Sequence, residues 1–171
     1  EKIAADNGVL EVRTAKSSQE ADELWGVRRA LSPAVGALAP DRVSEDISVP
    51  RNEFPEIVRR ISAIAGKYKL NFAVYGHAGD GNLHPSILCD LSDPRQAEVV
   101  HKAVDEIFAE TLKLGGTLSG EHGIGITKQN YLKNALGEDG VAVLKAIKMA
   151  LDPKGILNPG KVWAEEGKIH G

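Results

Sequence analysis

Residues 69–88 read KLNFAVYGHAGDGNLHPSIL, and their pattern predicts two strands joined by a tight turn. Apolar side chains lie at alternate positions in residues 69–75 and again in residues 83–88, which is typical of strands. Between them, residues 77–82 contain two glycines, an aspartate and an asparagine, the residue types that favour turns. The stretch therefore predicts an antiparallel hairpin with a glycine-rich tip.

Elements on either side of this hairpin follow from apolar spacing and from capping residues. Upstream, Ser17 and Glu20 match a capping box, so a helix is expected to begin there and to end before Pro33. The further predictions are strands at residues 9–14 and 46–50, an irregular connection at 32–43, helices at 51–66, 94–115 and about 140–150, and turns at 151–160.

The resulting order of strands and helices is not a regular βαβ alternation. Short links between strands instead suit an antiparallel sheet with helices packed on one face. The sequence therefore predicts an α+β fold, ferredoxin-like at its centre, with a further helical segment near its C-terminus.

Composition excludes several classes of function. The 171 residues suit one domain, with 42% hydrophobic and 26% charged residues and a net charge of −3. The absence of a basic block argues against nucleic-acid binding, and no apolar run approaches the roughly 20 residues of a transmembrane helix. One cysteine, Cys89, excludes an internal disulfide, is assigned to packing, and favours a cytoplasmic location. Because the chain begins without Met, we expect a piece of a longer protein.

Candidate metal ligands lie in two glycine-rich segments. On one strand, His77 and His84 would point to opposite faces, but a turn between them lets both imidazoles meet across the hairpin. Glu121, within Gly120-Glu-His-Gly-Ile-Gly125, would complete a His₂Glu set suited to Zn²⁺ or Mn²⁺, with positions left open for water or substrate. Asp80 is the alternative carboxylate, although Asp at this position also favours the turn itself. The alternative for both histidines is a structural hydrogen-bonding role.

Further candidates flank this set. The imidazole of His122 would lie next to the metal, where it is suited to act as a general base. The alternative is that His122 is a loop histidine that only orients its neighbour. Arg28 shares a helical turn with Trp25, so we expect it to point inward, whereas Arg29 should face solvent.

Five segments together resemble a known family. The chain is similar to the C-terminal domain of FAD-linked oxidases of the vanillyl-alcohol oxidase superfamily, with particular likeness to glycolate oxidase and to D-lactate and D-2-hydroxyglutarate dehydrogenases. The segments run in family order from residue 25 to 163 and read WGVRR at 25–29, SEDISVPR at 44–51, GHAGDGNLHP at 76–85, SGEHGIG at 119–125 and LDPKGILNPGK at 151–161.

This resemblance implies a two-domain flavoenzyme in which residues 1–171 form the substrate-facing C-terminal domain. The FAD-binding N-terminal domain would be a partner outside these residues, so we expect the isolated chain to be inactive. The resemblance implies that His77, His84 and Glu121 bind the metal and that His122 is the base. It also implies that Arg28 binds the carboxylate of the substrate and that Asn158 and Lys161 contact the flavin.

The implied reaction is oxidation of a 2-hydroxyacid, with FAD and a divalent metal as cofactors and an iron–sulfur subunit as a further partner that accepts electrons. Such partners would bring the protein to a membrane surface. The pattern of relatives that act on 2-hydroxyglutarate has Asn and Lys where Ser86 and Ser44 stand here, which favours glycolate or lactate. Two alternatives remain: a metallohydrolase that uses the same His₂Glu set, and a non-catalytic binding module.

Overall fold

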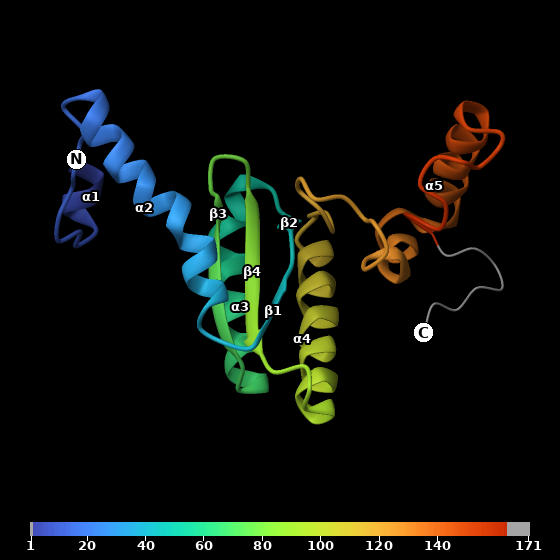
Figure 1. The fold of residues 1–171 in the computed structure, drawn as a ribbon, viewed down its shortest axis with the longest axis horizontal. Coiled ribbons are helices and arrows are strands. Elements are labelled where there is room, and N and C mark those ends of the chain that lie inside the picture. Colours follow the sequence, from blue (N-terminus) through green and yellow to red (C-terminus); the bar gives the residue numbers. More distant parts are fainter. Residues whose placement is uncertain (1, 164–171) are drawn as a thin grey trace. The chain divides into compact units, whose positions relative to one another are not determined.

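The computed structural model describes residues 2–163, and these divide into two compact units (Figure 1). The first unit is Glu1–Leu38 and the second is Ala39–Gly171. The first holds helices α1 (Lys2–Asp6) and α2 (Ser18–Gly36), and the second holds the sheet and the remaining helices.

The first unit differs in two ways from its prediction. Ser17 caps α2 as expected, because its side chain accepts a hydrogen bond from the backbone N–H of Glu20. The helix continues through Pro33, which lacks an N–H donor, and ends three residues later at Gly36. The predicted strand at residues 9–14 is wrong: these residues are mostly exposed and pair with no strand in the described chain, and a strand needs such a partner.

The sheet of the second unit is built around β4 (Asn82–Cys89). On one side β4 pairs with β3 (Asn71–His77), so the predicted hairpin is confirmed. On the other side it pairs with β1 (Asp41–Ser44) and β2 (Ile47–Ser48), and all three pairings are antiparallel. The strand β1 lies partly inside the predicted irregular connection, because pairing with β4 overrides the weak local signal.

The order of these elements confirms the α+β prediction and its ferredoxin-like centre. Thr117 forms an antiparallel bridge with Ser48 of β2, which places one further residue at that edge of the sheet, beside the strands β1 and β2. Taken in chain order, β1–β2, α3 (Phe54–Tyr68), β3, β4, α4 (Pro94–Lys113) and Thr117 follow the split βαββαβ pattern. A 3₁₀ turn, η1 (Arg51–Glu53), precedes α3.

Helices α3 and α4 pack against each other and against the sheet (Figure 1). Each presents an apolar stripe to the sheet, as the spacing predicted. Cys89 lies in the same core, which confirms its packing assignment. The shared core contains Ile47, Leu83 and Ile87 from the sheet, Ile57, Ile61 and Ile64 from α3, and Val100, Ala103, Val104, Ile107 and Phe108 from α4.

Truncation of one core side chain should therefore destabilise the second unit strongly. Ile61 is completely buried, so we expect Ile61→Ala to lower the free energy of unfolding by about 2–5 kcal/mol through lost burial and the cavity left behind. Urea-induced unfolding followed by circular dichroism measures this change. Ile3→Ala is the control, because Ile3 is 81% exposed and its truncation should change stability by only about 0.5 kcal/mol. Similar losses in both variants would contradict this description of the core.

The C-terminal part is more helical than predicted. Helix α5 spans Gln129–Leu151, whereas the sequence predicted a helix only from about residue 140. Gly137 interrupts it with a positive φ of 69°, so the segment is two helical pieces joined at a glycine. No helix among residues 2–163 combines the length and the hydropathy that a membrane span requires.

Candidate active site

The hairpin places His77 and His84 on the same face of the sheet. In the β3–β4 register Tyr75 pairs with His84 and His77 pairs with Asn82, and paired residues share a face. The intervening Leu83 points the other way, into the core below the helices. The two imidazole rings lie 5.6 Å apart between centroids, so the predicted meeting across the hairpin is confirmed.

Glu121 reaches these histidines from the loop that follows Thr117. Its Oε1 lies 3.0 Å from Nε2 of His84 and 3.8 Å from Nε2 of His77. One ligand atom from each of the three residues falls within 4.8 Å of the others. Donors about 2.1 Å from a tetrahedral ion are roughly 3.4 Å apart, so the three side chains fit a divalent metal after small shifts.

The electrostatics of His84 suit a metal ligand. Its side chain is buried, and this burial lowers its pKa even though the carboxylates of Asp46 and Glu121 act in the opposite direction. His84 is therefore neutral at neutral pH, which is the form of imidazole that coordinates metals.

Asp80, the alternative carboxylate ligand, belongs to neither cluster of candidate ligands among the described residues. Its backbone N–H donates to the backbone carbonyl of His77 within the turn.

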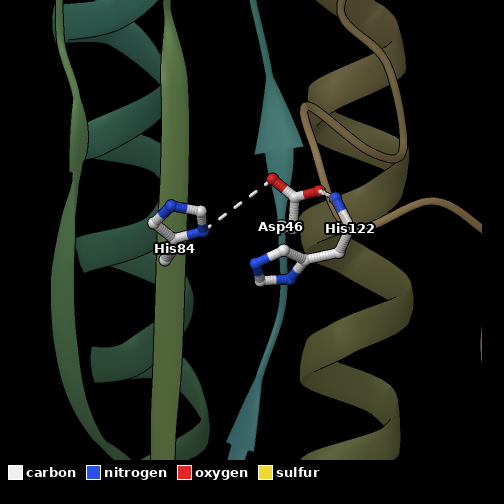
Figure 2. Close-up of side chains that lie close together, drawn as sticks. All are labelled: Asp46, His84 and His122. Carbon is white, nitrogen blue, oxygen red and sulfur yellow. Dashed lines mark hydrogen bonds and ion pairs between the residues drawn. The ribbon is translucent and has the colours of Figure 1, made fainter. Parts of the chain in front are cut away.

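A second cluster overlaps the first. Asp46, His84 and His122 also have candidate ligand atoms within 4.8 Å of one another, and Figure 2 shows the three side chains facing one another. The ring of His122 stacks on that of His84, with centroids 5.2 Å apart and planes inclined by 13°. Asp46, however, is fully buried and already accepts several hydrogen bonds, whereas His77 and Glu121 have side chains that are nearly half exposed. The first cluster is thus the one that solvent and a ligand can reach.

Asp46 holds the loop in place, and the sequence prediction did not include it. Its Oδ2 accepts hydrogen bonds from the Ser119 hydroxyl at 2.7 Å and from the backbone N–H groups of Glu121 and His122 at 2.9 and 2.8 Å. Burial raises the pKa of Asp46, but these donors outweigh it and lower that pKa to about 2. The only sequence signal was an acidic residue at the start of the predicted strand 46–50.

Lys128 is a second residue that the sequence prediction missed. Its buried ammonium donates to the backbone carbonyls of Asp46 and Leu118, both at 2.7 Å, and lies 3.6 Å from a carboxylate oxygen of Glu45. Burial lowers the pKa of Lys128 and raises that of Glu45. The lysine therefore joins the strand break before β2 to the start of the loop, a long-range link that no local pattern reveals.

The C-terminal tail returns to the same loop. Asn158 has a left-handed backbone, with φ of 50°, and its carbonyl accepts from the backbone N–H of Lys161. The backbone N–H of Val162 then donates to the carbonyl of Gly125 at 2.7 Å. Asn158 and Lys161 thus belong to a turn that is tied to the segment carrying Glu121.

Arg28 lies on α2 in the first unit and is exposed, so the expected inward orientation is wrong. Only Val35 of α2 is buried, and Trp25, which was expected to share its inward face, is 61% exposed. The physical reason is that the only other element among the described residues of the first unit is the five-residue helix α1, which is too short to cover a face of α2. Arg29 is exposed as predicted and donates to the backbone carbonyl of Asp22.

Comparison with known proteins shows the family of this chain. The sequence model of the family described as FAD linked oxidases, C-terminal domain, matches residues 1–162. The chain belongs to this family. It is 41% identical to glycolate oxidase subunit GlcD of Bacillus subtilis over 98% of its length, and 34% identical to a probable mitochondrial D-lactate dehydrogenase of Danio rerio over 95%.

These relatives are longer proteins. The chain spans 36% of the Bacillus subtilis protein and 33% of the Danio rerio protein. Among solved structures, 4-ethylphenol oxidase from Gulosibacter chungangensis shares the fold, with a TM-score of 0.59 and 21% identity over 95% of this chain and 34% of that one. The family membership agrees with the predicted resemblance, while the site residues rest on geometry alone.

Proposed function

We propose that residues 1–171 are the substrate-facing C-terminal domain of an FAD-dependent 2-hydroxyacid dehydrogenase. The observation that carries the proposal is the convergence of His77, His84 and Glu121, with His122 beside them, in a chain of the FAD-linked oxidase family. The FAD-binding part would be the N-terminal domain of the same protein, since the relatives from Bacillus subtilis and Danio rerio are about three times as long.

His77, His84 and Glu121 would hold the divalent ion, Zn²⁺ or Mn²⁺. Two imidazoles and one carboxylate form a ligand set that suits either ion and leaves coordination positions open. When bound, such an ion would lower the pKa of a substrate hydroxyl, and the flavin would accept the hydride from the carbon that carries it. This chain's own residues hold, orient and deprotonate the substrate.

His122 is assigned the base that removes the hydroxyl proton. Its Nε2 lies 3.8 Å from Oε1 of Glu121, and its side chain is 56% exposed, so a substrate held beside Glu121 would be within reach. The hydrogen bond from its backbone N–H to Asp46 fixes the loop from which the imidazole projects. Proton removal by a group held in this way is general-base catalysis.

Three further residues are assigned supporting roles. The exposed guanidinium of Arg28 is available to a substrate carboxylate, for which a two-pronged Arg contact gives both charge and orientation. Asn158 and Lys161, in the turn tied to Gly125, are assigned to the flavin side of the site. Each role depends on the joined domains and is tested only in the complete protein.

The substrate we favour is a short 2-hydroxyacid, glycolate or D-lactate. Ser44 and Ser86 lie opposite each other in the β1–β4 register, and their hydroxyl oxygens are 3.0 Å apart. Two short neutral groups that satisfy each other offer no charge to a second carboxylate, so a dicarboxylate gains nothing at these positions. The electron acceptor would be a partner such as an iron–sulfur subunit, in a cytoplasmic enzyme that meets a membrane only through partners.

The complete protein tests this proposal by its turnover of glycolate, D-lactate and D-2-hydroxyglutarate with an artificial electron acceptor. We expect turnover of a short substrate, its loss on chelation, recovery on addition of Zn²⁺ or Mn²⁺, and a fall in kcat of about 100-fold or more in His122→Asn. His101→Asn is the control, because His101 lies on α4 outside both candidate clusters. Chelator-sensitive hydrolysis without flavin reduction would instead favour a metallohydrolase, and full activity of His122→Asn would contradict the assigned base.

A further inference from the structure

Two buried polar atoms beside the site face each other. Oδ1 of Asp46 and Nδ1 of His84 are both inaccessible to solvent and without a hydrogen-bond partner among the described residues. They lie 3.8 Å apart, as Figure 2 shows with a dashed line. A buried polar group without a partner costs about 1–3 kcal/mol, so a closer approach of these two atoms satisfies both.

The hydrogen bonds already made by Asp46 decide which atom donates. Its Oδ2 accepts from the Ser119 hydroxyl and from the backbone N–H groups of Glu121 and His122, an arrangement that favours the ionised carboxylate. An ionised carboxylate can only accept hydrogen bonds. The remaining oxygen, Oδ1, therefore requires a proton on Nδ1 of His84.

We propose that Asp46 is a positioning residue that keeps the proton of His84 on Nδ1, so that Nε2 offers its lone pair to the ion that His77, His84 and Glu121 would hold. The inference rests on the metal site of the proposed function, because Nε2 is the atom 3.0 Å from Glu121. A neutral imidazole carries one proton, and a proton on one nitrogen leaves the other free to coordinate.

The carboxylate of Asp46 also contacts both segments that carry the candidate metal ligands, the hairpin and the loop after Thr117. One oxygen faces the hairpin at His84, and the other holds the backbone of the loop that carries Glu121 and His122. Lys128 fixes Asp46 in turn by donating to its backbone carbonyl. The distance between the ligands on the hairpin and the ligand on the loop is thus set by one buried side chain.

The Glu121→Ala variant gives the first test, because it removes the carboxylate that lies 3.0 Å from Nε2 and would otherwise favour a proton there in the metal-free protein. In this variant of the complete, metal-free protein with ¹⁵N-labelled histidine at about pH 8, two-dimensional ¹H–¹⁵N spectra distinguish a protonated from an unprotonated ring nitrogen, and loss of a signal on adding His84→Gln assigns it. We expect Nδ1 of His84 to be protonated and Nε2 unprotonated. Protonation of Nε2 in this variant would overturn the inference whatever the metal does.

Asp46→Asn gives the second test. Its amide oxygen can still accept the loop N–H groups, but its NH₂ group would face Nδ1 of His84 and act as a donor. We expect the proton to move to Nε2 when Asp46→Asn is added to Glu121→Ala, and the affinity for added Zn²⁺ to fall about 10- to 100-fold when Asp46→Asn is made alone, as for other partners of metal-bound histidines. In the control Ser119→Ala, which removes one donor to Oδ2, the tautomer should stay unchanged.

An unchanged tautomer when Asp46→Asn is added to Glu121→Ala would also overturn the inference. If that variant fails to fold, the spectrum of Glu121→Ala still decides. The expected tautomer in Glu121→Ala, together with no affinity of the wild-type protein for Zn²⁺ or Mn²⁺, would support the role of Asp46 and contradict the proposed metal site, so the two failures are distinguishable.

Discussion

Glu121→Gln should lower the affinity of the protein for Zn²⁺ or Mn²⁺ by on the order of 100-fold or more and abolish oxidation of the hydroxyacid. Glutamine keeps the shape of the side chain but removes the negative charge, and Oε1 of Glu121 is the atom that approaches both His77 and His84. Because the Glu121 side chain is 49% exposed, the fold should tolerate the change. Titration calorimetry with the metal alone measures affinity, and turnover is assayed on the same preparations.

The matched control is Glu138→Gln on α5. Glu138 is also an exposed glutamate and pairs with Lys133, outside both ligand clusters, so its neutralisation should leave metal affinity unchanged. Normal affinity in Glu121→Gln would contradict the His₂Glu set. His77→Gln and His122→Gln then separate the two clusters: loss only in His77→Gln fits the first, and loss only in His122→Gln fits the cluster with Asp46 and His84.

Local patterns were sufficient for the parts of the fold that have strong periodicity. The β3–β4 hairpin, α3 and α4 follow from alternating or helical apolar spacing, and each has a buried face that tertiary packing reinforces. The first half of α5 was missed because Gly137 breaks the pattern there. Residues 9–14 alternate like a strand, but no pairing in the described chain supports one.

The candidate site was predictable in part for a similar reason. His77, His84, Glu121 and His122 stand in short segments where ligand-type side chains lie among glycines, and this contrast is visible in the sequence. The supporting residues have no such mark. Lys128 acts through backbone carbonyls of residues distant in the chain, and Arg28 is one of several exposed residues on α2.

Asp46 illustrates why an outer layer of a site is hard to derive from sequence. Its partners are Ser119, Glu121 and His122, more than seventy positions away, and the bridge between Thr117 and Ser48 brings them to this edge of the sheet. That bridge brings the loop over the break between β1 and β2. The sequence contained each part of this contact, but the topology that joins them comes from the packing of α4.

Gly81→Ala should destabilise the hairpin by about 3 kcal/mol, through backbone strain and overlap of the added methyl group. Gly81 has φ of 72°, a left-handed conformation that costs an L-residue about 1–2 kcal/mol. An added Cβ would also lie 2.0 Å from the backbone carbonyl oxygen of Val49, which cannot move freely because the N–H of Val49 donates to Gly81. Strain and overlap therefore add at one position. Urea unfolding measures the loss.

Gly79→Ala in the same turn is the matched control. A Cβ at Gly79 would meet no atom within 4 Å, so the change in stability should stay within about 0.5 kcal/mol. Equal stability of the two variants would mean that Val49 does not hold the turn. Because Gly81 lies between His77 and His84, a hairpin displaced by the added methyl should also separate the imidazoles. We therefore expect Gly81→Ala, but not Gly79→Ala, to weaken Zn²⁺ binding even at temperatures where the variant stays folded.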